Sequence, residues 1–203
     1  MLWYVGYGSN LDRDRFLRYL TGGRAAGARR AVPGARDTTP PADERAVVVP
    51  GRMFFGWESP TWGGGVSFLD ADADDTAYGR AYLLTEAQFA DVAAQEMHQE
   101  PGQDLDLAHV LEHRRHALGP GRYETLHLLG ELEGTPMLTF TADDPRSLGL
   151  NPPVPAYLSI LARGLRDTHG LDEDAVVEHL VTRPGMADWD AEAVGRVLGR
   201  ASD

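Results

Sequence analysis

The sequence predicts an α+β fold, with short strands in the first part of the chain and longer helices in the last. Up to about residue 140, short stretches rich in β-branched and aromatic side chains alternate with turns of Gly, Pro and Asp. From about residue 155 onward, apolar side chains recur at helical spacing. Runs of strands followed by runs of helices are typical of α+β proteins. At 203 residues, the chain has the size of one domain with a substantial core.

The composition is that of an acidic globular protein. Its 19 Lys and Arg face 31 Asp and Glu, and the net charge of −12 repels phosphate backbones, which argues against a nucleic-acid partner. The lack of cysteine excludes disulfides, thiolate metal sites and a cysteine nucleophile. The N-terminal residues lack a basic segment followed by a long apolar one, and no apolar run has the length of a membrane span. We therefore expect a soluble, cytoplasmic protein with no membrane partner.

The N-terminal strand and the loop after it form the first candidate site. Leu2–Tyr7 is apolar and rich in aromatic side chains, as a buried strand should be, and Gly8 allows the chain to turn sharply. Apolar residues then recur at helical spacing from Phe16, with Asn10 or Asp12 as the N-cap. The unpaired N–H groups at such a helix start can hold a carboxylate or an oxyanion. The alternative is an ordinary strand, turn and helix without a ligand.

Residues 22–41 are predicted to form a long loop that is basic within an acidic protein. The segment is dense in Gly, Ala and Pro and carries four arginines, namely Arg24, Arg29, Arg30 and Arg36. Its simplest interpretation is a solvated surface segment. The functional interpretation is a positive rim that attracts an acidic substrate or partner.

Short strands are predicted next, around an aromatic and glycine-rich tip. They lie at Ala46–Val49, Arg52–Phe55 and Val66–Leu69. Trp57, Trp62 and the run Gly63-Gly64-Gly65 lie between the last two strands, which suggests that the backbone approaches a ligand or another strand closely. A flexible hairpin tip is the alternative. The carboxylates of residues 70–75 lack the central glycine and distal glutamate of a calcium loop, so we interpret them as a solvated turn.

The helix after the interior strand Tyr78–Leu84 carries the main catalytic candidate. Thr85 and Gln88 form a capping box that starts a helix running toward His98. On this helix Glu96 shares an apolar, core-facing stripe with Phe89, Val92 and Ala93. A partly buried carboxylate without a charge partner is expected to have a raised pKa, which suits a general acid or base. The alternative is a glutamate whose head reaches solvent or pairs with an arginine.

A second motif, His109-Val110-Leu111-Glu112-His113, matches the H-x-x-E-H pattern of some zinc hydrolases. It lies in a helix or irregular segment over residues 105–118 and would place two imidazoles one helical turn apart, with His116 continuing the same face. Arg114 and Arg115 add positive charge that disfavours a dication, and a third ligand cannot be identified. We therefore favour a solvated polar helix and expect no metal.

The remaining predicted elements are a hairpin and three helices. They comprise strands at Tyr123–Leu129 and Thr135–Phe140, paired around residues 130–134, and helices from Pro155 to near Gly170, from Asp172 to about Thr182, and from Asp188 or Asp190 to Leu198. Tyr157 lies in the first turn of its helix. There its hydroxyl could reach the mouth of a pocket, or its ring could simply cover the core.

Several of these residues, in the same order, resemble the γ-glutamylcyclotransferase-like family. The run Tyr7-Gly8-Ser9-Asn10-Leu11, directly after an N-terminal strand, is similar to the signature loop of that family. The resemblance extends in order over residues 1–170, through Phe55-Gly56, Trp62-Gly63-Gly64, Tyr78-Gly79-Arg80-Ala81-Tyr82, a helix bearing Glu96, and Pro155-Ala156-Tyr157-Leu158 at the start of a later helix.

The resemblance implies a fold, a reaction and a set of site residues. The fold is a small closed mixed β-barrel with helices packed outside, formed by residues 1–170 and followed by a C-terminal helical extension of the same domain at residues 171–203. The reaction releases 5-oxoproline from a γ-glutamyl compound by attack of the substrate's α-amine on its own γ-carbonyl, and it needs no cofactor. Glu96 corresponds to the catalytic general acid and base, and the substrate-binding residues are Tyr7, Gly8, Ser9, Asn10, Leu11 and Tyr157.

Several alternatives stay open. Family members often have a glycine after the catalytic glutamate, whereas Met97 stands here, and Glu100 lies one turn further along, so either Glu96 or Glu100 could be the base. The competing functions are a non-catalytic small-molecule binding module on the same fold and a zinc hydrolase that uses the H-x-x-E-H segment. The sequence does not choose between γ-glutamyl amino acids, γ-glutamylamines, glutathione and a γ-glutamyl biosynthetic intermediate. It also leaves a homodimer open.

Overall fold

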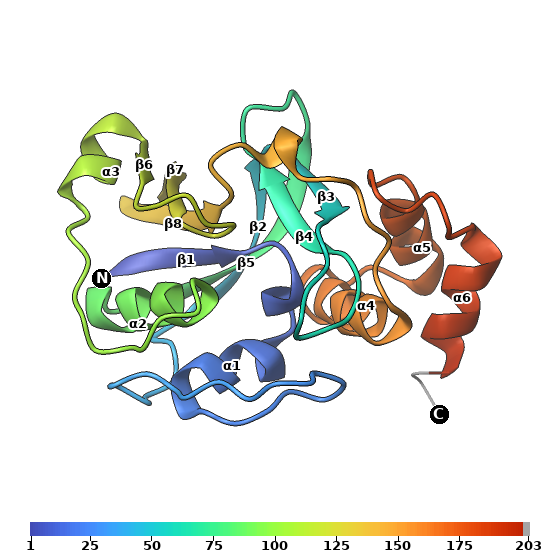
Figure 1. Ribbon diagram of the computed structural model, residues 1–203, viewed down its shortest axis with the longest axis horizontal. Helices are drawn as coiled ribbons and strands as arrows, with labels where there is room; N and C mark the ends of the chain where they lie inside the picture. The colour runs from blue at the N-terminus through green and yellow to red at the C-terminus, as the bar shows by residue number, and fades with distance from the viewer. Residues whose placement is uncertain (201–203) are drawn as a thin grey trace.

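The computed structural model of the protein describes residues 1–200 and has the predicted α+β fold (Figure 1). The strands are β1 (Leu2–Gly6), β2 (Glu44–Pro50), β3 (Arg52–Gly56), β4 (Val66–Asp70), β5 (Thr76–Leu84), β6 (Arg115–Ala117), β7 (Thr125–Leu132) and β8 (Thr135–Thr141). Six of them form a mixed sheet in the order β2-β5-β1-β8-β7-β6, and β3 pairs with β4 in a separate two-stranded sheet. The predicted hairpin of β7 and β8 is present.

The helices lie in two groups around the sheet (Figure 1). They are α1 (Arg13–Thr21), α2 (Glu86–Glu96), α3 (Ala108–His113), α4 (Pro155–His169), α5 (Glu173–Val181) and α6 (Ala191–Arg200), with short 3-10 turns η1 (Ser9–Leu11) and η2 (Pro145–Ser147). Helices α1 and α2 lie side by side along one face of the sheet, whereas α4, α5 and α6 form a cluster at the other end of the molecule, next to β3 and β4.

Strand β1 lies in the middle of the fold and is buried on both faces. It pairs antiparallel with β5 and parallel with β8, and all five of its residues are buried. Because side chains alternate along a strand, Trp3 and Val5 pack with β3, β4 and α4, whereas Leu2 and Tyr4 pack with α1 and α2. The strand therefore delivers the loop that follows it to the junction between the two core clusters.

The closed barrel implied by the resemblance is not confirmed. Within residues 1–200, β2 and β6 are the edges of the six-stranded sheet, and β3 and β4 pair with each other instead of continuing that sheet. The chain leaves β2 through Pro50 and Gly51, and Gly51 has a φ of +113°, a conformation that favours glycine. This bend directs β3 away from the main sheet.

Most element boundaries agree with the prediction, and the differences have local causes. The capping box of Thr85 and Gln88 is present, but α2 ends at Glu96, and His98 has a left-handed φ of 59° that cannot continue the helix. In the segment predicted as helix or irregular structure, Arg114 has a φ of 68° that ends α3. Strand β6 follows and pairs with β7, a pairing that sequence periodicity did not predict.

The start of α1 uses one of the two predicted N-caps. The loop after β1 first forms η1, and the N-cap is Asp12, whose Oδ1 accepts a hydrogen bond from the Arg15 backbone N–H at 2.8 Å. Asp12 also pairs with Arg163 of α4. The buried carboxylate of Asp12 thus caps the first turn of α1, and its negative charge disfavours a second anion at this helix start.

The two C-terminal helices are part of the core. Val176 and Leu180 of α5 and Val194 and Leu198 of α6 are fully buried in the same cluster as the strands. Residues 201–203 of the predicted extension lie outside the described residues. None of the helices described combines the length and the apolar character that a membrane span requires.

Candidate functional site

A pocket of about 330 Å³ opens beside the loop after β1. Its walls come from segments far apart in the sequence: the β1 loop and α1, the basic loop, the connection between β3 and β4, and the C-terminal end of α2. Six of the seven predicted site residues line it, namely Tyr7, Gly8, Ser9, Asn10, Glu96 and Tyr157. The volume is in the range of small-molecule sites in proteins.

Leu11 is the exception among the predicted site residues. It is 1% exposed and lies in the core, outside the pocket lining. A Cβ added to Gly164 of α4 would come within 2.6 Å of the Leu11 side chain, so α4 packs directly on η1. We conclude that Leu11 holds the loop against α4 and does not face the pocket.

Lack of space is one reason why glycine stands at position 8. Its φ of −116° is negative, but its ψ of −136° lies outside the main β and α regions. A Cβ at this position would lie 2.9 Å from the Cβ of Ser67 on β4 and 3.2 Å from the hydroxyl oxygen of Tyr157 on α4. The β1 loop therefore approaches both elements more closely than a side chain permits.

Glu96 meets the β1 loop inside the pocket. The amide Nδ2 of Asn10 donates one hydrogen bond to Glu96 Oε1 at 3.1 Å and another to the Tyr4 hydroxyl at 2.8 Å. Asn10 is 5% exposed, while Glu96, the last residue of α2, is partly exposed. The predicted stripe is present, because Phe89, Val92 and Ala93 on the same face are fully buried. Glu96 thus combines a fixed position with access to the pocket.

A buried cation, Arg15, lies in the same wall of the pocket. It is 6% exposed, donates a hydrogen bond from Nη2 to the Tyr19 hydroxyl at 2.8 Å, and has its guanidinium carbon 4.4 Å from the centre of the Tyr19 ring. Burial acts to lower the pKa of Arg15, but its interactions with Tyr19 and Glu96 outweigh burial and raise that pKa. Glu96 therefore has Arg15 as a nearby positive charge. The sequence-based prediction had assumed a carboxylate without a charge partner.

Ser67, which lines the pocket next to the β1 loop, is held between two tyrosines. The backbone N–H of Ser67 donates to the Tyr157 hydroxyl at 3.0 Å, and the Tyr123 hydroxyl donates to the Ser67 carbonyl at 2.9 Å. Tyr157 is 3% exposed, and its ring meets Trp62 edge-on with centroids 5.2 Å apart. Tyr157 therefore does both things that the sequence left open, since it covers the core and its hydroxyl reaches the pocket.

Tyrosine hydroxyls provide much of the polar lining. Burial is the main cause that raises the pKa of each lining tyrosine, namely Tyr4, Tyr7, Tyr19, Tyr123 and Tyr157. These hydroxyls therefore keep their protons at neutral pH and can donate hydrogen bonds. Tyr7, for example, donates to the Phe140 carbonyl at 3.0 Å. The carboxylates in the lining are Glu96 and the more exposed Glu100. An acid-base reaction in this pocket would therefore depend on one of these two glutamates.

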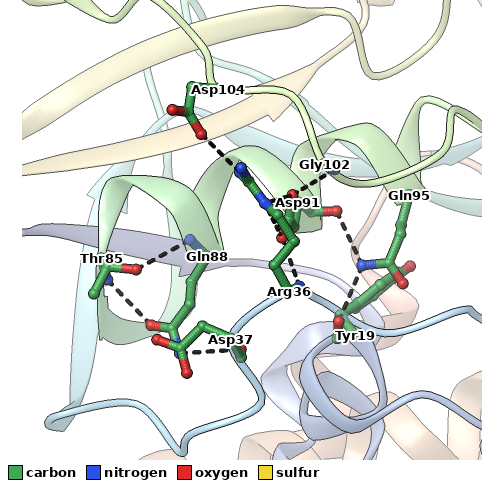
Figure 2. A network of polar contacts seen from close by, with 9 residues as sticks. All are labelled: Tyr19, Arg36, Asp37, Thr85, Gln88, Asp91, Gln95, Gly102 and Asp104. Carbon is green, nitrogen blue, oxygen red and sulfur yellow. Dashed lines mark hydrogen bonds and ion pairs between the residues drawn. The ribbon is translucent and has the colours of Figure 1, made fainter.

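A network of polar contacts fixes α2 to the basic loop (Figure 2). Asp91 of α2 is fully buried and accepts hydrogen bonds from the backbone N–H groups of Arg36 at 2.8 Å and Gly102 at 2.9 Å. The Arg36 Nε lies 3.0 Å from Asp91 Oδ2, and Arg36 also pairs with Asp104. Gln95 donates from Nε2 to the Tyr19 carbonyl at 3.0 Å, which joins α2 to α1. These contacts hold Glu96 in register with Asn10 and Arg15.

The mouth of the pocket carries two residues with left-handed backbone. Trp57 has a φ of 54° and His98 a φ of 59°, both uncommon for residues with large side chains. The Arg122 guanidinium carbon lies 4.3 Å from the centre of a Trp57 ring. Arg30 of the basic loop also lines the pocket and is exposed. Among the four arginines of the basic loop, Arg36 binds Asp91 and so ties the loop to α2. The position of Arg30 at the pocket is consistent with the predicted positive rim.

The glycine run at residues 63–65 approaches another segment of the chain. A Cβ on Gly65 would lie 1.8 Å from the Asn151 carbonyl oxygen, and one on Gly63 would lie 2.4 Å from an Arg29 guanidinium nitrogen. The backbone does approach its neighbours closely, but they are the loop at Asn151 and the Arg29 side chain, where a ligand or another strand was expected. Asn151 also donates from Nδ2 to the Trp57 carbonyl at 2.7 Å, which secures the mouth.

Sequence reasoning missed Arg15, Tyr19, Ser67 and Tyr123. Arg15 and Tyr19 are four residues apart and therefore share a face of α1 with buried Phe16 and Leu20, so an arginine on an apolar helical face was the available signal. Ser67 and Tyr123 had no such signal. They reach the pocket through contacts between elements far apart in the sequence, since Ser67 of β4 bonds to Tyr157 of α4 and to Tyr123 before β7, and local patterns do not encode such contacts.

The H-x-x-E-H segment does not form a metal-binding arrangement. The rings of His109 and His113 on α3 have centroids 4.5 Å apart, His116 on β6 lies 4.5 Å from His109, and Glu112 contacts His113 at 3.7 Å. Among the residues that the structure describes, no group of three or more His, Asp or Glu side chains is arranged to hold a metal ion. This segment also lies apart from the residues that line the pocket.

Comparison with known proteins places the fold. No family model matches the chain. Among curated proteins, histone deacetylase 5 from Arabidopsis thaliana is 30% identical over 205 residues. The match covers 90% of this chain but 31% of that protein, so the chain spans about a third of that relative's length.

Among solved structures, a γ-glutamyl cyclotransferase has a TM-score of 0.55 at 15% identity and 98% coverage of both chains. An uncharacterized protein from Homo sapiens has a TM-score of 0.54 at 15% identity, covering 100% of this chain and 98% of the other. The near-complete coverage of both solved chains shows that this protein has the γ-glutamyl cyclotransferase fold.

Proposed function

We propose that the protein is a γ-glutamyl cyclotransferase, which releases 5-oxoproline from a γ-glutamyl compound and uses Glu96 as the general acid and base. The observation that carries the proposal is the hydrogen bond between Asn10 of the β1 loop and Glu96 of α2 inside one small pocket. Support also comes from the fold, since a solved γ-glutamyl cyclotransferase matches the chain over almost its whole length. The fold alone does not determine an activity, so the proposal rests on the residues of the pocket.

The reaction is an internal aminolysis. The α-amine of the substrate attacks its γ-carbonyl carbon, a C–N bond forms, and the carbonyl oxygen becomes an oxyanion. Glu96 takes the proton that the amine loses and then gives a proton to the leaving nitrogen as the original C–N bond breaks. The products are 5-oxoproline and a free amine or amino acid. Two proton transfers at one site suit a single carboxylate that is fixed in position and open to the pocket.

The β1 loop is the proposed source of hydrogen bonds to the oxyanion. Within η1, the N–H of Leu11 donates to the Gly8 carbonyl at 2.9 Å and the N–H of Asp12 to the Ser9 carbonyl at 3.2 Å. The amides of Gly8, Ser9 and Asn10 precede these in the chain. The Ser9 amide faces the Tyr157 hydroxyl, and we assign those of Gly8 and Asn10 to the substrate. Backbone donors held in place before the reaction stabilise developing charge without the cost of reorganisation.

A panel of γ-glutamyl compounds tests the proposal. A γ-glutamyl amino acid, a γ-glutamylamine and glutathione are incubated with the wild-type protein, and 5-oxoproline is measured by chromatography with and without a chelator. We expect 5-oxoproline from at least one compound, at a rate that the chelator does not change. Absence of 5-oxoproline from all of them, together with calorimetric binding of 5-oxoproline, would establish the binding module instead.

A further inference from the structure

Glu96 is the last residue of α2, so the helix fixes its side chain from one side only. His98, two residues later, has a left-handed φ of 59° and has already left the helix. Helix ends fray, and a catalytic group that is displaced by about 1 Å can lose about 100-fold in rate. A carboxylate at this position therefore needs contacts from other elements. The hydrogen bond from Asn10 is one of them, and α1 provides others.

Tyr19 of α1 contacts the end of α2 through both its backbone and its hydroxyl. Its carbonyl accepts a hydrogen bond from Gln95 Nε2 at 3.0 Å (Figure 2). Its hydroxyl faces the carboxylate of the next residue, Glu96. Tyr19 lines the pocket and is 3% exposed. Burial is the main cause that raises the pKa of Tyr19, and Glu96 acts in the same direction. The hydroxyl therefore keeps its proton and can donate it in a hydrogen bond to the carboxylate.

Arg15 determines where the Tyr19 hydroxyl can donate. Arg15 Nη2 donates to the hydroxyl oxygen at 2.8 Å, and the guanidinium carbon lies 4.4 Å from the centre of the ring. Because the oxygen accepts from Arg15, the hydroxyl proton is left for another acceptor, and Glu96 is the carboxylate that it faces. In the part of the chain that the structure describes, Arg15 makes no direct ion pair. The Tyr19 hydroxyl thus links the two opposite charges.

We propose that Tyr19 is a positioning residue for Glu96, whose carboxylate it holds with a hydroxyl that Arg15 polarises. The inference rests on the proposed function and deepens it. Glu96 takes and gives the proton, while Tyr19 keeps its own. Hydrogen bonds in a chain polarise one another, and a bond to an ionised acceptor is stronger than one to a neutral acceptor. The contact therefore holds Glu96 most firmly in the ionised form that must accept the proton of the amine.

A double-mutant cycle tests whether Tyr19 acts through Glu96. The substitution Tyr19→Phe keeps the ring and removes the hydroxyl. With γ-glutamyl-alanine as substrate, it should lower kcat by about 10- to 100-fold and change KM by less than about 3-fold. In the Glu96→Gln background the same substitution should lower kcat by less than about 3-fold, because the carboxylate that it positions is absent. Equal losses in both backgrounds, or a rise in KM with unchanged kcat, would overturn the inference.

Tyr123→Phe is the matched control for the kinetic cycle. Tyr123 also lines the pocket, but its hydroxyl donates to the Ser67 carbonyl at 2.9 Å. Whatever its effect on kcat, the factor should be the same with Glu96 and with Gln at position 96, because this hydroxyl does not act through Glu96. Thermal melting of all variants shows whether any loss reflects unfolding.

A spectroscopic measurement keeps the inference testable even if the proposed reaction does not occur. The seven tyrosines are labelled with ¹³C at Cζ, and their NMR signals are assigned from Tyr→Phe variants. Without substrate, the Tyr19 signal should move in Glu96→Gln and in Arg15→Gln. It should stay in place in Arg13→Gln, which removes a more exposed cation of α1 that pairs with Glu44. A Tyr19 signal that does not respond to Glu96→Gln would overturn the inference, whereas absence of 5-oxoproline from the wild type would overturn only the proposed reaction.

Discussion

Asn10 and Glu96 are 86 residues apart in the sequence, yet Asn10 Nδ2 donates a hydrogen bond to Glu96 Oε1 at 3.1 Å. The bond joins the loop after the central strand to the C-terminal end of α2. It fixes the Glu96 carboxylate in the pocket. Asn10 is itself held in place by its second hydrogen bond, to the Tyr4 hydroxyl.

Glu96→Gln should lower turnover by at least ~10²-fold and leave the fold intact. The amide oxygen of glutamine can still accept the hydrogen bond from Asn10, but glutamine cannot carry a proton between the two steps. The measurement is 5-oxoproline release together with thermal melting. Glu100→Gln is the matched control, because Glu100 lines the same pocket but is exposed beyond the helix end. A larger loss in the Glu100 variant would move the catalytic role to that residue.

Gly8→Val should abolish binding of a γ-glutamyl ligand while the protein remains folded. The new side chain would need space that Ser67 and Tyr157 occupy, so the β1 loop must move away from β4. Loss of one well-placed backbone donor lowers the rate by roughly 10²–10³-fold. Calorimetric titration with 5-oxoproline and thermal melting provide the measurement. Gly149→Val is the control, because a Cβ on Gly149 meets nothing within 4 Å among the described residues. Unchanged affinity in a folded Gly8 variant would show that the loop is only a turn.

Asp91→Ala should destabilise the protein by about 2–4 kcal/mol. The substitution leaves the backbone N–H groups of Arg36 and Gly102 without their acceptor and frees the basic loop from α2. The free energy of unfolding in urea gives the measurement. Asp104→Ala removes the exposed partner of Arg36, whose side chain accessibility is 80%, and should change stability little. Equal effects of the two substitutions would contradict the role of the buried network.

The double variant His109→Ala with His113→Ala should leave both activity and metal content unchanged. These rings lie on α3 outside the pocket lining. Elemental analysis of the purified protein and the 5-oxoproline assay give the two measurements. Stoichiometric zinc in the wild type that disappears in the double variant would restore the zinc-hydrolase alternative.

Stability should fall as the pH drops from about 6.5 to about 4, because His179 must stay neutral in the folded protein. Burial is the main cause that lowers the pKa of His179 from 6.5 to about 4, and the nearby charge of Arg183 acts in the same direction. The unfolded chain therefore binds more protons in this window, so the free energy of unfolding rises with pH through it and levels off above it. The ring packs against Tyr78, with centroids 4.9 Å apart.

The expected loss over this pH window is about 1–3 kcal/mol, allowing for partial solvent exposure of the ring. Urea unfolding at a series of pH values measures it. The variant His179→Gln should show a flatter dependence of stability on pH, although burial also lowers the pKa of His169 on the other side of Tyr78. An equally steep dependence in that variant would assign the effect to other groups.

The sequence by itself determined the elements whose signals are local. The apolar run of β1, the capping box of Thr85 and Gln88, and the helix that begins at Pro155 are each specified by residues within a few positions of one another. Glu96 could be selected as a candidate because helical spacing fixes which face of α2 it shares. These predictions depend on backbone periodicity and capping, which neighbouring residues decide.

Only the tertiary structure decided which of these residues meet. It placed Leu11 in the core, chose Asp12 over Asn10 as the N-cap of α1, and left the main sheet open where a closed barrel was expected. It also brought Arg15 into the pocket with Glu96. A single sequence records the spacing of side chains along one element. The distance between Arg15 on α1 and Glu96 on α2 depends on how both helices pack against the sheet, and that packing is set by the summed burial of many residues across the fold.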